Sequence, residues 1–446
     1  MTTGKKILIF GLGKEGASAA RYLQSKNEVT VVDQKPKEEI NQDFLEGIDS
    51  VSFHTETDLP ENENFGLIVR SPGVRPDNST IRKLTANGAQ LTSPTQIFFE
   101  ESPARIIGVT GTKGKGTTST LIYEMLKTEG EDVHLAGNIG TPMLDILQNL
   151  STKSVVVLEL SSFQLVDLTK SPHIAVVLMI TSEHLNWHTD EGEYQEAKTS
   201  IVKFQTEGDF AVVNDDFEAS KSFSQKTKAK VLFFSTKKST NGTYLEGNNL
   251  VSASRGKIIG ANEVLLPGPH NIQNALAASA AAELMGISSE NIASVLKSFK
   301  GLKHRLQLIR DVDGVKYYND SFSTTPETTI AAIEAFDEPK ILILGGSSKN
   351  SNFKSLAQKI LSTPSIKALI FIGTEAETIK KAISQEGTFG GKIQEGPKSI
   401  EEIVEAAYNL AESGDIALLS PACASFDMFK NYEDRGEQFI KEVEKL

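Results

Sequence analysis

The sequence predicts an α/β protein of three domains, each built on a mainly parallel sheet. Short apolar runs typical of buried strands alternate along the chain with stretches of helical spacing, which favours parallel sheets covered by helices on both faces. The chain has 446 residues, enough for roughly three domains of about 150 residues each. We expect the domains to span residues 1–92, 93–300 and 301–446.

Composition and charge narrow the class of protein. The net charge of −12 argues against non-specific binding of nucleic acid and of anionic membrane surfaces. Cys423 is the single cysteine, so no internal disulfide can form, which fits a reducing cytosol. The apolar run Ile7–Phe10 is too short for a signal sequence, and no stretch is long enough to span a bilayer. We therefore expect a cytoplasmic protein with no nucleic-acid or membrane partner. Separately, we expect a monomer.

The first block contains a glycine-rich turn between a strand and a helix. An expected strand, Ile7–Phe10, leads through the GxGxxG sequence of Gly11–Gly16 into a helix expected over Ala17–Ser25, and a second strand, Val29–Val32, ends at Asp33. An acidic residue about 20 positions after such a turn is typical of Rossmann-like domains that bind a diphosphate and a ribose. NAD and a UDP-sugar fit this pattern equally well, and a plain turn without a ligand stays open. 

The second block carries the strongest nucleotide signal in the chain. The glycine-rich sequence Gly108–Thr118 follows an apolar run at Arg105–Ile107 and precedes a stretch of helical spacing. Such a turn points backbone N–H groups and the helix dipole at one spot, which holds polyphosphate, and Lys115 would reach the outer phosphates. Gly116 stands where Ser or Thr usually contacts Mg²⁺, so we assign that contact to Thr117. The pattern predicts a P-loop ATPase-like domain that binds ATP or GTP.

Two polar side chains at strand ends suit a divalent cation. Glu159 ends the expected strand Val155–Leu158, and His184 follows the expected strand Ile174–Ile180. Carboxylate oxygens are the ligands that Mg²⁺ and Mn²⁺ prefer, and an imidazole is tolerated. Open α/β sheets bind ligands at the carboxyl ends of their strands. The alternatives are a carboxylate that caps a helix and a core histidine.

Other polar positions have weaker interpretations. Lys198, taken alone, is expected to be a solvated helix lysine. Asn271 opens an alanine-rich helix, where it could read a base edge or serve as an ordinary N-cap. Asp320 follows the expected strand Val315–Tyr318 and offers a carboxylate to a nucleotide. Residues 221–262 are polar and are expected to form a β-rich excursion.

The third block repeats the strand–loop pattern. Strands expected at Ile341–Leu344, Ala368–Phe371 and Ile416–Leu419 each end in a loop of small residues. This arrangement predicts a second open α/β sheet, and therefore a Rossmann-like C-terminal domain.

Seven short motifs occur along the chain in one order: Gly-Thr-Lys-Gly-Lys, Gly-Asn-Ile-Gly, Glu-Leu-Ser-Ser-Phe-Gln-Leu, His-Asn-Ile-Gln-Asn, His-Arg, Asn-Asp-Ser and Ser-Pro-Ala-Cys-Ala-Ser. Together they resemble the Mur ligases of peptidoglycan synthesis over essentially the whole length. Residues 420–436 are similar to the members that join D-glutamate to UDP-N-acetylmuramoyl-L-alanine. The resemblance implies an ATP-dependent ligase, in which ATP phosphorylates the acceptor carboxylate and the glutamate amine then attacks the acyl phosphate.

The resemblance also implies which residues hold each ligand. ATP would contact the phosphate loop and three later residues: Gly111, Thr112, Lys113, Gly114, Lys115, Gly116, Thr117, Asn271, Arg305 and Asp320. Mg²⁺ or Mn²⁺ would be held by Thr117, Glu159, His184 and a carbamylated Lys198, and the catalytic residues would be Lys115, His184 and Lys198. The sugar nucleotide would contact Leu12, Gly13, Asp33, Gln34, Lys35, Ser71, Gly73 and Asn138. Glutamate would contact Thr324, Lys349, Ser425 and Tyr432.

Departures from the family pattern keep other activities open. Phe322 stands where the family often has lysine, and Ser347–Asn350 is a variant of the usual loop, so a ligase that uses L-glutamate stays possible. A folylpolyglutamate synthase-like ligase would explain the phosphate loop but not the GxGxxG turn. An NAD-binding dehydrogenase would leave the phosphate loop and Glu159 without a role.

Overall fold

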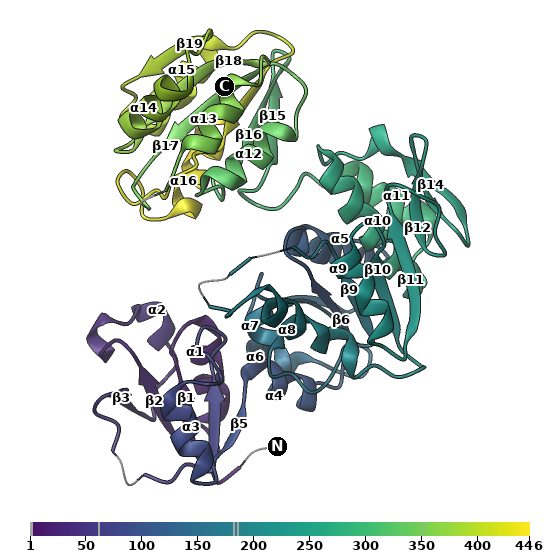
Figure 1. Ribbon diagram of the computed structural model, residues 1–446, viewed down its shortest axis with the longest axis vertical. Coiled ribbons are helices and arrows are strands. Elements are labelled where there is room, and N and C mark those ends of the chain that lie inside the picture. The colour runs from purple at the N-terminus through teal and green to yellow at the C-terminus, as the bar shows by residue number, and fades with distance from the viewer. Residues whose placement is uncertain (1–2, 61–62, 182, 185–186, 350) are drawn as a thin grey trace. The chain divides into compact units, whose positions relative to one another are not determined.

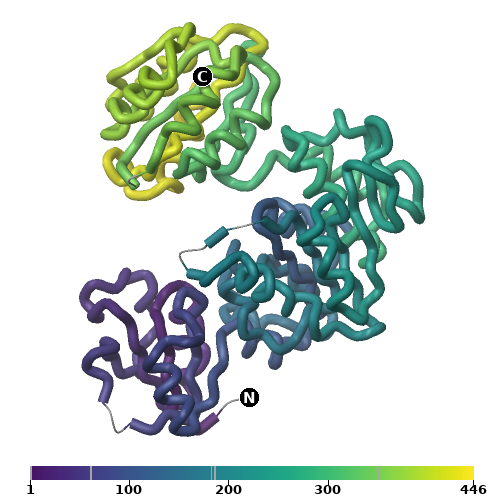
Figure 2. The backbone as a smooth tube through the Cα atoms, viewed as in Figure 1, coloured from purple at the N-terminus to yellow at the C-terminus, as the bar shows by residue number. Residues whose placement is uncertain are grey.

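The computed structural model describes residues 3–60, 63–181, 183–184, 187–349 and 351–446. Three separate sheets follow one another along the sequence, and Figure 1 and Figure 2 trace the chain through them from the purple N-terminal end to the yellow C-terminal end. The predicted α/β class and the mainly parallel sheets are confirmed.

The first sheet is entirely parallel and has the order β3-β2-β1-β4-β5. Its strands are β1 Lys6–Phe10, β2 Glu28–Asp33, β3 Val51–Thr55, β4 Leu67–Arg70 and β5 Gln90–Thr92. The helices are α1 Lys14–Leu23, α2 Gln42–Leu45, α3 Ser79–Ala86 and α4 Pro94–Glu101, with a short 3₁₀ turn at Lys37–Glu39. Alternate residues of β1 face opposite sides: Ile7 and Ile9 belong to the core with α1, and Leu8 and Phe10 to the core with α3.

The second sheet has nine strands in the order β14-β13-β12-β11-β10-β9-β6-β8-β7, parallel from β7 to β12 and antiparallel beyond. The strands are β6 Arg105–Thr110, β7 Val133–Gly137, β8 Val155–Glu159, β9 Ile174–Val177, β10 Phe210–Asn214, β11 Lys230–Ser235, β12 Thr243–Glu246, β13 Asn249–Ser252 and β14 Gly256–Gly260. The last four form the expected β-rich excursion.

The helices around this sheet are α5 Lys115–Thr128, α6 Met143–Ile146, α7 Ser162–Leu165, α8 Glu191–Lys203, α9 Glu218–Lys221, α10 Pro269–Leu284 and α11 Ser289–Ser298. Short 3₁₀ turns lie at Leu147–Asn149, Ser222–Gln225 and Ala261–Glu263.

The third sheet has the order β15-β16-β20-β17-β18-β19, parallel except for the β15–β16 pair. Its strands are β15 Gln307–Val312, β16 Val315–Asn319, β17 Lys340–Gly345, β18 Ile366–Ile372, β19 Lys392–Glu395 and β20 Ile416–Leu419. One face packs on α12 Pro326–Glu334, α13 Lys354–Leu361 and α14 Ala376–Glu386, and the other on α15 Ile400–Leu410 and α16 Tyr432–Val443. The edge strand β19 exposes all of its residues.

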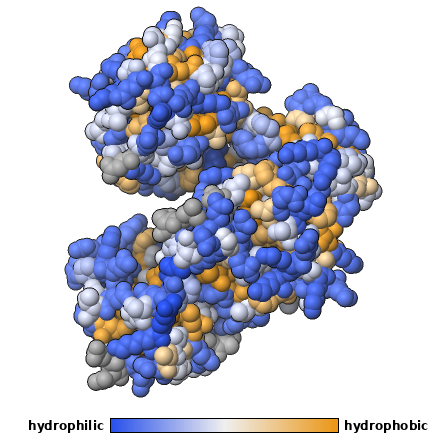
Figure 3. All heavy atoms as spheres, in the orientation of Figure 1, coloured by the Kyte–Doolittle hydropathy of each residue, from blue (hydrophilic) through white to orange (hydrophobic). Residues whose placement is uncertain are grey.

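Contacts divide the chain into two compact units. The first comprises residues 1–264 and 272–297, and the second residues 265–271 and 298–446. The first two sheets share the first unit, where one hydrophobic core includes residues of α1, α4, α6 and α8. In the described part of the chain, no helix combines the length and apolarity needed to cross a bilayer. The face drawn in Figure 3 is mostly hydrophilic, with apolar side chains in small separate patches.

Candidate functional site

The glycine-rich loop between β6 and α5 folds around its own lysine. Lys115 is the first residue of α5, and its Nζ donates to the carbonyl oxygens of Gly111 (2.9 Å) and Thr112 (3.0 Å). Gly114 has a φ of +85°, and a Cβ there would lie 2.2 Å from Oδ1 of Asn274. Only glycine fits this position. The loop is therefore held in one shape, with the N-terminus of α5 at its end.

Lys198 lies under this loop. The prediction of a solvated lysine is wrong, because α8 turns the side chain inward with Tyr194 and Ile201, and Lys198 is only 1% exposed. Its Nζ donates to the Gly111 carbonyl (3.3 Å) and lies 3.5 Å from Oγ1 of Thr110. Burial lowers the pKa of Lys198 well below its ordinary value, and the charge of Lys115 lowers it further. The environment therefore favours a neutral amine.

Glu159 and His184 belong to the same neighbourhood. Glu159 ends β8, is 6% exposed, and its Oε1 accepts a hydrogen bond from the Asn138 side chain (2.7 Å). His184 is half-exposed, has a φ of +59°, and places Nε2 3.6 Å from a carboxylate oxygen of Glu183. Burial lowers the pKa of His184, and the charge of Lys115 acts in the same direction. Phosphate loop, buried lysine, carboxylate and imidazole thus lie together.

Lys113 lies at the outer side of this loop. Its Nζ contacts Oε1 of Glu183 at 2.7 Å, and the lysine side chain is largely exposed. Elsewhere on the described chain, as here, no three His, Cys, Asp or Glu side chains gather into a ready-made metal site. A cation at this position therefore needs ligands of other kinds as well, and the predicted set, with Thr117 and Lys198, has them.

The first turn, Gly11–Gly16, is closed by side chains of neighbouring strands. Asp33, the last residue of β2, accepts hydrogen bonds from the backbone N–H groups of Leu12 (2.7 Å) and Lys35 (3.0 Å). The Ser71 hydroxyl donates to the Gly11 carbonyl at 2.5 Å. A Cβ at Gly16 would lie 2.0 Å from that carbonyl oxygen. Leu12, Asp33 and Ser71 are thus brought together, whereas Gly13 and Gln34 are exposed beside them.

In the second unit, Asp320 anchors the segment that carries Arg305. Asp320 is 2% exposed, and its carboxylate accepts hydrogen bonds from the Leu306 N–H (3.1 Å) and the Ser420 hydroxyl (2.8 Å). Burial raises the pKa of Asp320 to about 6. The neighbours His304 and Leu306 both have positive φ values, 63° and 43°. A buried carboxylate thus fixes a strained turn at Arg305.

Arg305 projects onto an aromatic ring. Its guanidinium lies 4.2 Å from the centroid of Phe322, and the Phe322 ring meets Tyr432 edge-on at 5.3 Å. Thr324, two residues after Phe322, accepts a hydrogen bond at Oγ1 from Nζ of Lys349 (2.9 Å). Phe322, which stands where the family often has lysine, therefore makes a cation–π contact with Arg305. A lysine at this position would repel the guanidinium.

The remaining predicted residues are also placed by local contacts. The Asn271 side chain donates to the Pro267 carbonyl at 2.6 Å, within the second unit. Ser425 is 2% exposed, and its carbonyl accepts from the N–H of Phe429 at 2.8 Å. The predicted ATP contacts Asn271, Arg305 and Asp320 therefore belong to one unit and the phosphate loop to the other.

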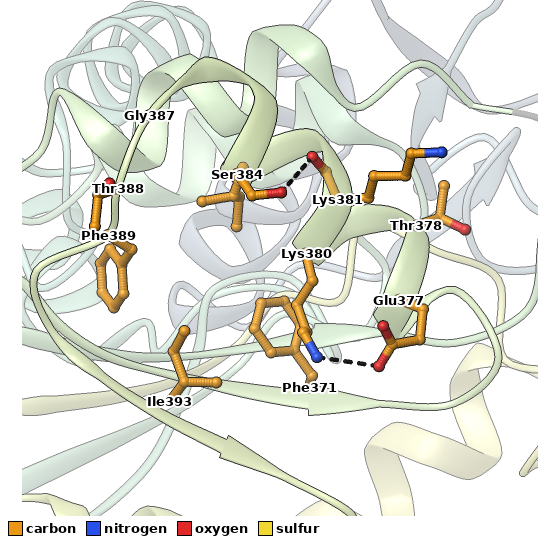
Figure 4. A pocket seen from close by; sticks show the side chains of 11 residues that line it. Phe371, Glu377, Thr378, Lys380, Lys381, Ser384, Gly387, Thr388, Phe389 and Ile393 are labelled. Atoms are coloured by element: carbon orange, nitrogen blue, oxygen red, sulfur yellow. Dashed lines mark hydrogen bonds and ion pairs between the residues drawn. The ribbon is translucent and has the colours of Figure 1, made fainter.

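A cavity of about 830 Å³ lies between α14 and the strands β18 and β19 (Figure 4). Its lining mixes aromatic and aliphatic side chains, such as Phe371, Phe389 and Ile393, with the lysines of α14. Lys380 there is paired with Glu377 (3.1 Å). None of the predicted site residues lines it, so it plays no part in the assignment.

Three family models match successive parts of the chain. The N-terminal domain of MurD-like Mur ligases matches residues 5–93, the Mur ligase middle domain residues 109–282, and the glutamate ligase domain of Mur ligases residues 304–423. A UDP-N-acetylmuramoylalanine–D-glutamate ligase of Clostridioides difficile is 39% identical over 99% of this chain and 99% of its own. One of Streptococcus pneumoniae is 39% identical over 99% and 98%. The chain belongs to the Mur ligase family.

Solved structures show the same fold. The UDP-N-acetylmuramate-alanine ligase MurC of Thermotoga maritima aligns with this Mur ligase over 99% of both chains, with a TM-score of 0.60 and 16% identity. MurF of the same organism, in complex with ADP, aligns over 98% of both chains, with a TM-score of 0.59 and 19% identity. The three-domain α/β architecture predicted from the sequence is confirmed.

Sequence reasoning missed several side chains that hold the site of this Mur ligase in place. Arg70 and Arg435 are both fully buried. Arg435 donates to Ser321 and to the carbonyl of Cys423, which joins α16 to the loop that carries Ser425. Trp187 donates from its indole N–H to the Gly73 carbonyl at 2.9 Å. A signal for Arg70 exists, since a charged residue directly follows the apolar run of β4.

Proposed function

We propose that this Mur ligase joins D-glutamate to UDP-N-acetylmuramoyl-L-alanine at the expense of ATP, with Mg²⁺ or Mn²⁺, in peptidoglycan synthesis. The observation that carries the proposal is the phosphate loop, where Lys115 and the buried Lys198 both reach the Gly111 carbonyl. Full-length relatives that are named D-glutamate ligases support the choice of substrates. We also propose domain boundaries at residues 92 and 300 and a cytoplasmic monomer.

The chemistry needs positive charge more than covalent help from the protein. The acceptor carboxylate attacks the γ-phosphorus of ATP, the bond to ADP breaks, and the spreading negative charge is stabilised by cations. Lys115 supplies one of these charges at the loop. The amine of glutamate then attacks the acyl carbon, loses its proton, and phosphate leaves as the amide forms.

The metal ion supplies further positive charge at the transferring phosphoryl group. Thr117, Glu159, His184 and a carbamate on Lys198 would hold it. Oxygen donors dominate this set, which suits Mg²⁺. The lowered pKa of Lys198 supports the carbamate, because only the neutral amine forms an N–C bond with CO₂, releasing one proton and leaving an anionic group. 

The other predicted residues are assigned to the sugar nucleotide, to glutamate and to ATP. Leu12, Asp33 and Ser71 surround the Gly11 turn and would frame the sugar nucleotide, together with Gly13, Gln34, Lys35, Gly73 and Asn138. Thr324 and Lys349, which touch each other, would bind the glutamate carboxylates with Ser425 and Tyr432. Asn271, Arg305 and Asp320 would contact ATP.

Ligation with L-glutamate is the second candidate. Phe322 replaces a cationic side chain beside the proposed amino-acid pocket, which changes how a carboxylate is received there. A dehydrogenase is disfavoured, because it would leave the phosphate loop and Glu159 without a role. A folylpolyglutamate synthase-like activity is disfavoured by the match over the whole chain.

The test is phosphate release with ATP, Mg²⁺ and UDP-N-acetylmuramoyl-L-alanine, with D-glutamate and L-glutamate in separate reactions. We expect turnover with D-glutamate alone. Turnover with L-glutamate alone would replace the proposal with the second candidate, and turnover with neither would exclude this acceptor.

A further inference from the structure

Arg70, the last residue of β4, is a charged side chain without any exposure to solvent. The rest of β4, Leu67–Val69, consists of apolar residues packed into the two cores of the first sheet. A buried guanidinium is costly unless its N–H groups are paired, so its partners reveal what the position is for.

One side of the Arg70 guanidinium is tied to the segment around α7. Nε donates to Oδ2 of Asp167 at 2.8 Å, and Nη2 donates to Oδ1 at 2.9 Å, which makes a bidentate pair. Nη2 also donates to the Phe163 carbonyl at 2.9 Å. The planar fork of arginine matches the two carboxylate oxygens in a way that a lysine ammonium does not. Arg70 is therefore fixed relative to the second sheet.

The other side holds the loop that follows β4. Nη1 donates to the carbonyl oxygens of Ser71 (3.2 Å), Pro72 (3.2 Å) and Val74 (2.6 Å). The backbone of the Ser71–Val74 loop therefore curves around Nη1 of Arg70. The same loop is held from two more directions, by the Ser71 hydroxyl on the Gly11 carbonyl and by the Trp187 indole on the Gly73 carbonyl.

A second ion pair, between Arg21 and Asp145, also joins elements of the first and second sheets and can be compared with the Arg70–Asp167 pair. Arg21 of α1 lies 3.2 Å from Asp145 of α6, and both side chains are about 30% exposed, at 31% and 28%. Arg21 donates to Asp145 and to the Glu46 carbonyl, and neither belongs to the turns at Gly11 and Ser71. It joins the two sheets without touching the loop that Arg70 shapes.

We propose that Arg70 is a positioning residue for the sugar nucleotide: it sets the Ser71–Val74 loop against the second sheet, so that a bound acceptor presents its carboxylate toward the phosphate loop. The proposal rests on the function proposed above, since it takes the Ser71 loop as part of the sugar-nucleotide site. 

The test compares Arg70→Lys and Arg70→Met with the matched control Arg21→Met. Steady-state kinetics are measured with UDP-N-acetylmuramoyl-L-alanine varied, and again with ATP and with D-glutamate varied. We expect the Arg70 variants to raise the KM for the sugar nucleotide roughly 10-fold or more, as for loss of a charged hydrogen-bond set, with the KM for ATP changed less than about 2-fold. Arg21→Met should leave all three KM values close to wild type.

Folding is checked by circular dichroism, and Asp167→Asn serves where the Arg70 variants do not fold. It weakens the anchor but keeps the bonds from Arg70 to the loop carbonyls, so a smaller KM increase for the same substrate is expected. An unchanged KM in folded variants, or equal increases for all three substrates, would overturn the proposal and leave Arg70 with a purely structural role.

Failure of the proposed function gives a different pattern, namely a wild-type protein without turnover. Calorimetric titration with UDP-N-acetylmuramoyl-L-alanine then decides the role of Arg70. Binding that is weakened in Arg70→Lys but not in Arg21→Met supports positioning. Equal binding by all variants, or none by the wild type, contradicts it.

Discussion

The turns Gly11–Gly16 and Gly111–Lys115 both join a parallel strand to a helix, but acidic side chains surround the first turn and lysines the second. At the first turn, the Asp33 carboxylate accepts from the Leu12 N–H, and the carboxyl of Glu15 is largely buried. At the second, Lys115 and Lys198 converge on the Gly111 carbonyl. The same backbone pattern is thus built once with acids and once with bases.

The difference teaches that glycine spacing alone does not specify a ligand. Both turns place helix N–H groups at the end of a strand, which suits phosphate in general. The side chains around each turn then decide how much negative charge it tolerates. We infer that the basic turn suits a triphosphate and its reaction, and the acidic turn a ligand that is only bound.

The largest effect is expected from Lys115→Ala, which removes the cation of the basic turn. Loss of one preorganised charge at a reacting phosphoryl group costs on the order of 10²- to 10³-fold in kcat. Phosphate release measures it, and Lys127→Ala, an exposed lysine of the same helix, is the control. Wild-type turnover in Lys115→Ala would end the assignment of the phosphate loop.

Lys198→Ala is expected to lose activity by roughly 10²-fold or more, since it removes a proposed ligand of the metal ion that stabilises charge on the transferring phosphoryl group. Acetate should restore part of the rate if a carbamate normally stands there. The control is Lys203→Ala, an exposed lysine of α8. Full activity without acetate would remove the carbamate from the mechanism, and equal rescue of the control would show a general salt effect.

Asp33→Asn tests the acidic turn. The variant loses charge at two backbone hydrogen bonds, so the free energy of unfolding should fall by about 1–3 kcal/mol and the KM for the sugar nucleotide should rise, with kcat less affected. Urea unfolding and kinetics measure the two effects. Glu28→Gln, an exposed position of β2, is the control. A loss of kcat as large as that of Lys115→Ala would mean that both turns serve the reaction.

The effect expected from Glu15→Gln is on stability alone, and it depends on pH. Burial raises the pKa of Glu15 from 4.5 to about 7, so the folded state holds a proton that the unfolded state releases. The contribution of Glu15 to the free energy of unfolding of the wild type therefore falls as pH rises from about 4.5 to about 7. The variant should match wild type at pH near 4 and exceed it at pH near 8 by up to about 3 kcal/mol, at about 1.4 kcal/mol per pKa unit.

Thermal unfolding across this pH range measures the difference, with the exposed Glu39→Gln as the control. A stability gain that is independent of pH would show that the Glu15 carboxyl ionises in the folded protein as freely as in the unfolded chain.

The sequence predicted the sheets better than the surroundings of single side chains. Apolar runs such as Val155–Leu158 coincide with β8, because a strand that is buried on both faces consists of consecutive apolar residues. The helix that follows the phosphate loop begins at Lys115, inside the glycine-rich sequence Gly108–Thr118, since the glycines hide the first helical turn. Lys198 was misjudged because its burial depends on α8 packing under β6, a contact between distant segments. Arg70 was missed for the same reason, since Asp167 lies far along the chain.

The edge strand β19 has a consequence for the behaviour of the protein at high concentration. An open sheet edge is a template on which another copy can add a strand. Here the edge has only the residues Lys392–Glu395, and its charged ends make stacking of copies unfavourable in a parallel register. Replacing Lys392 and Glu395 by valine should therefore promote self-association of the protein, visible as an increase in light scattering.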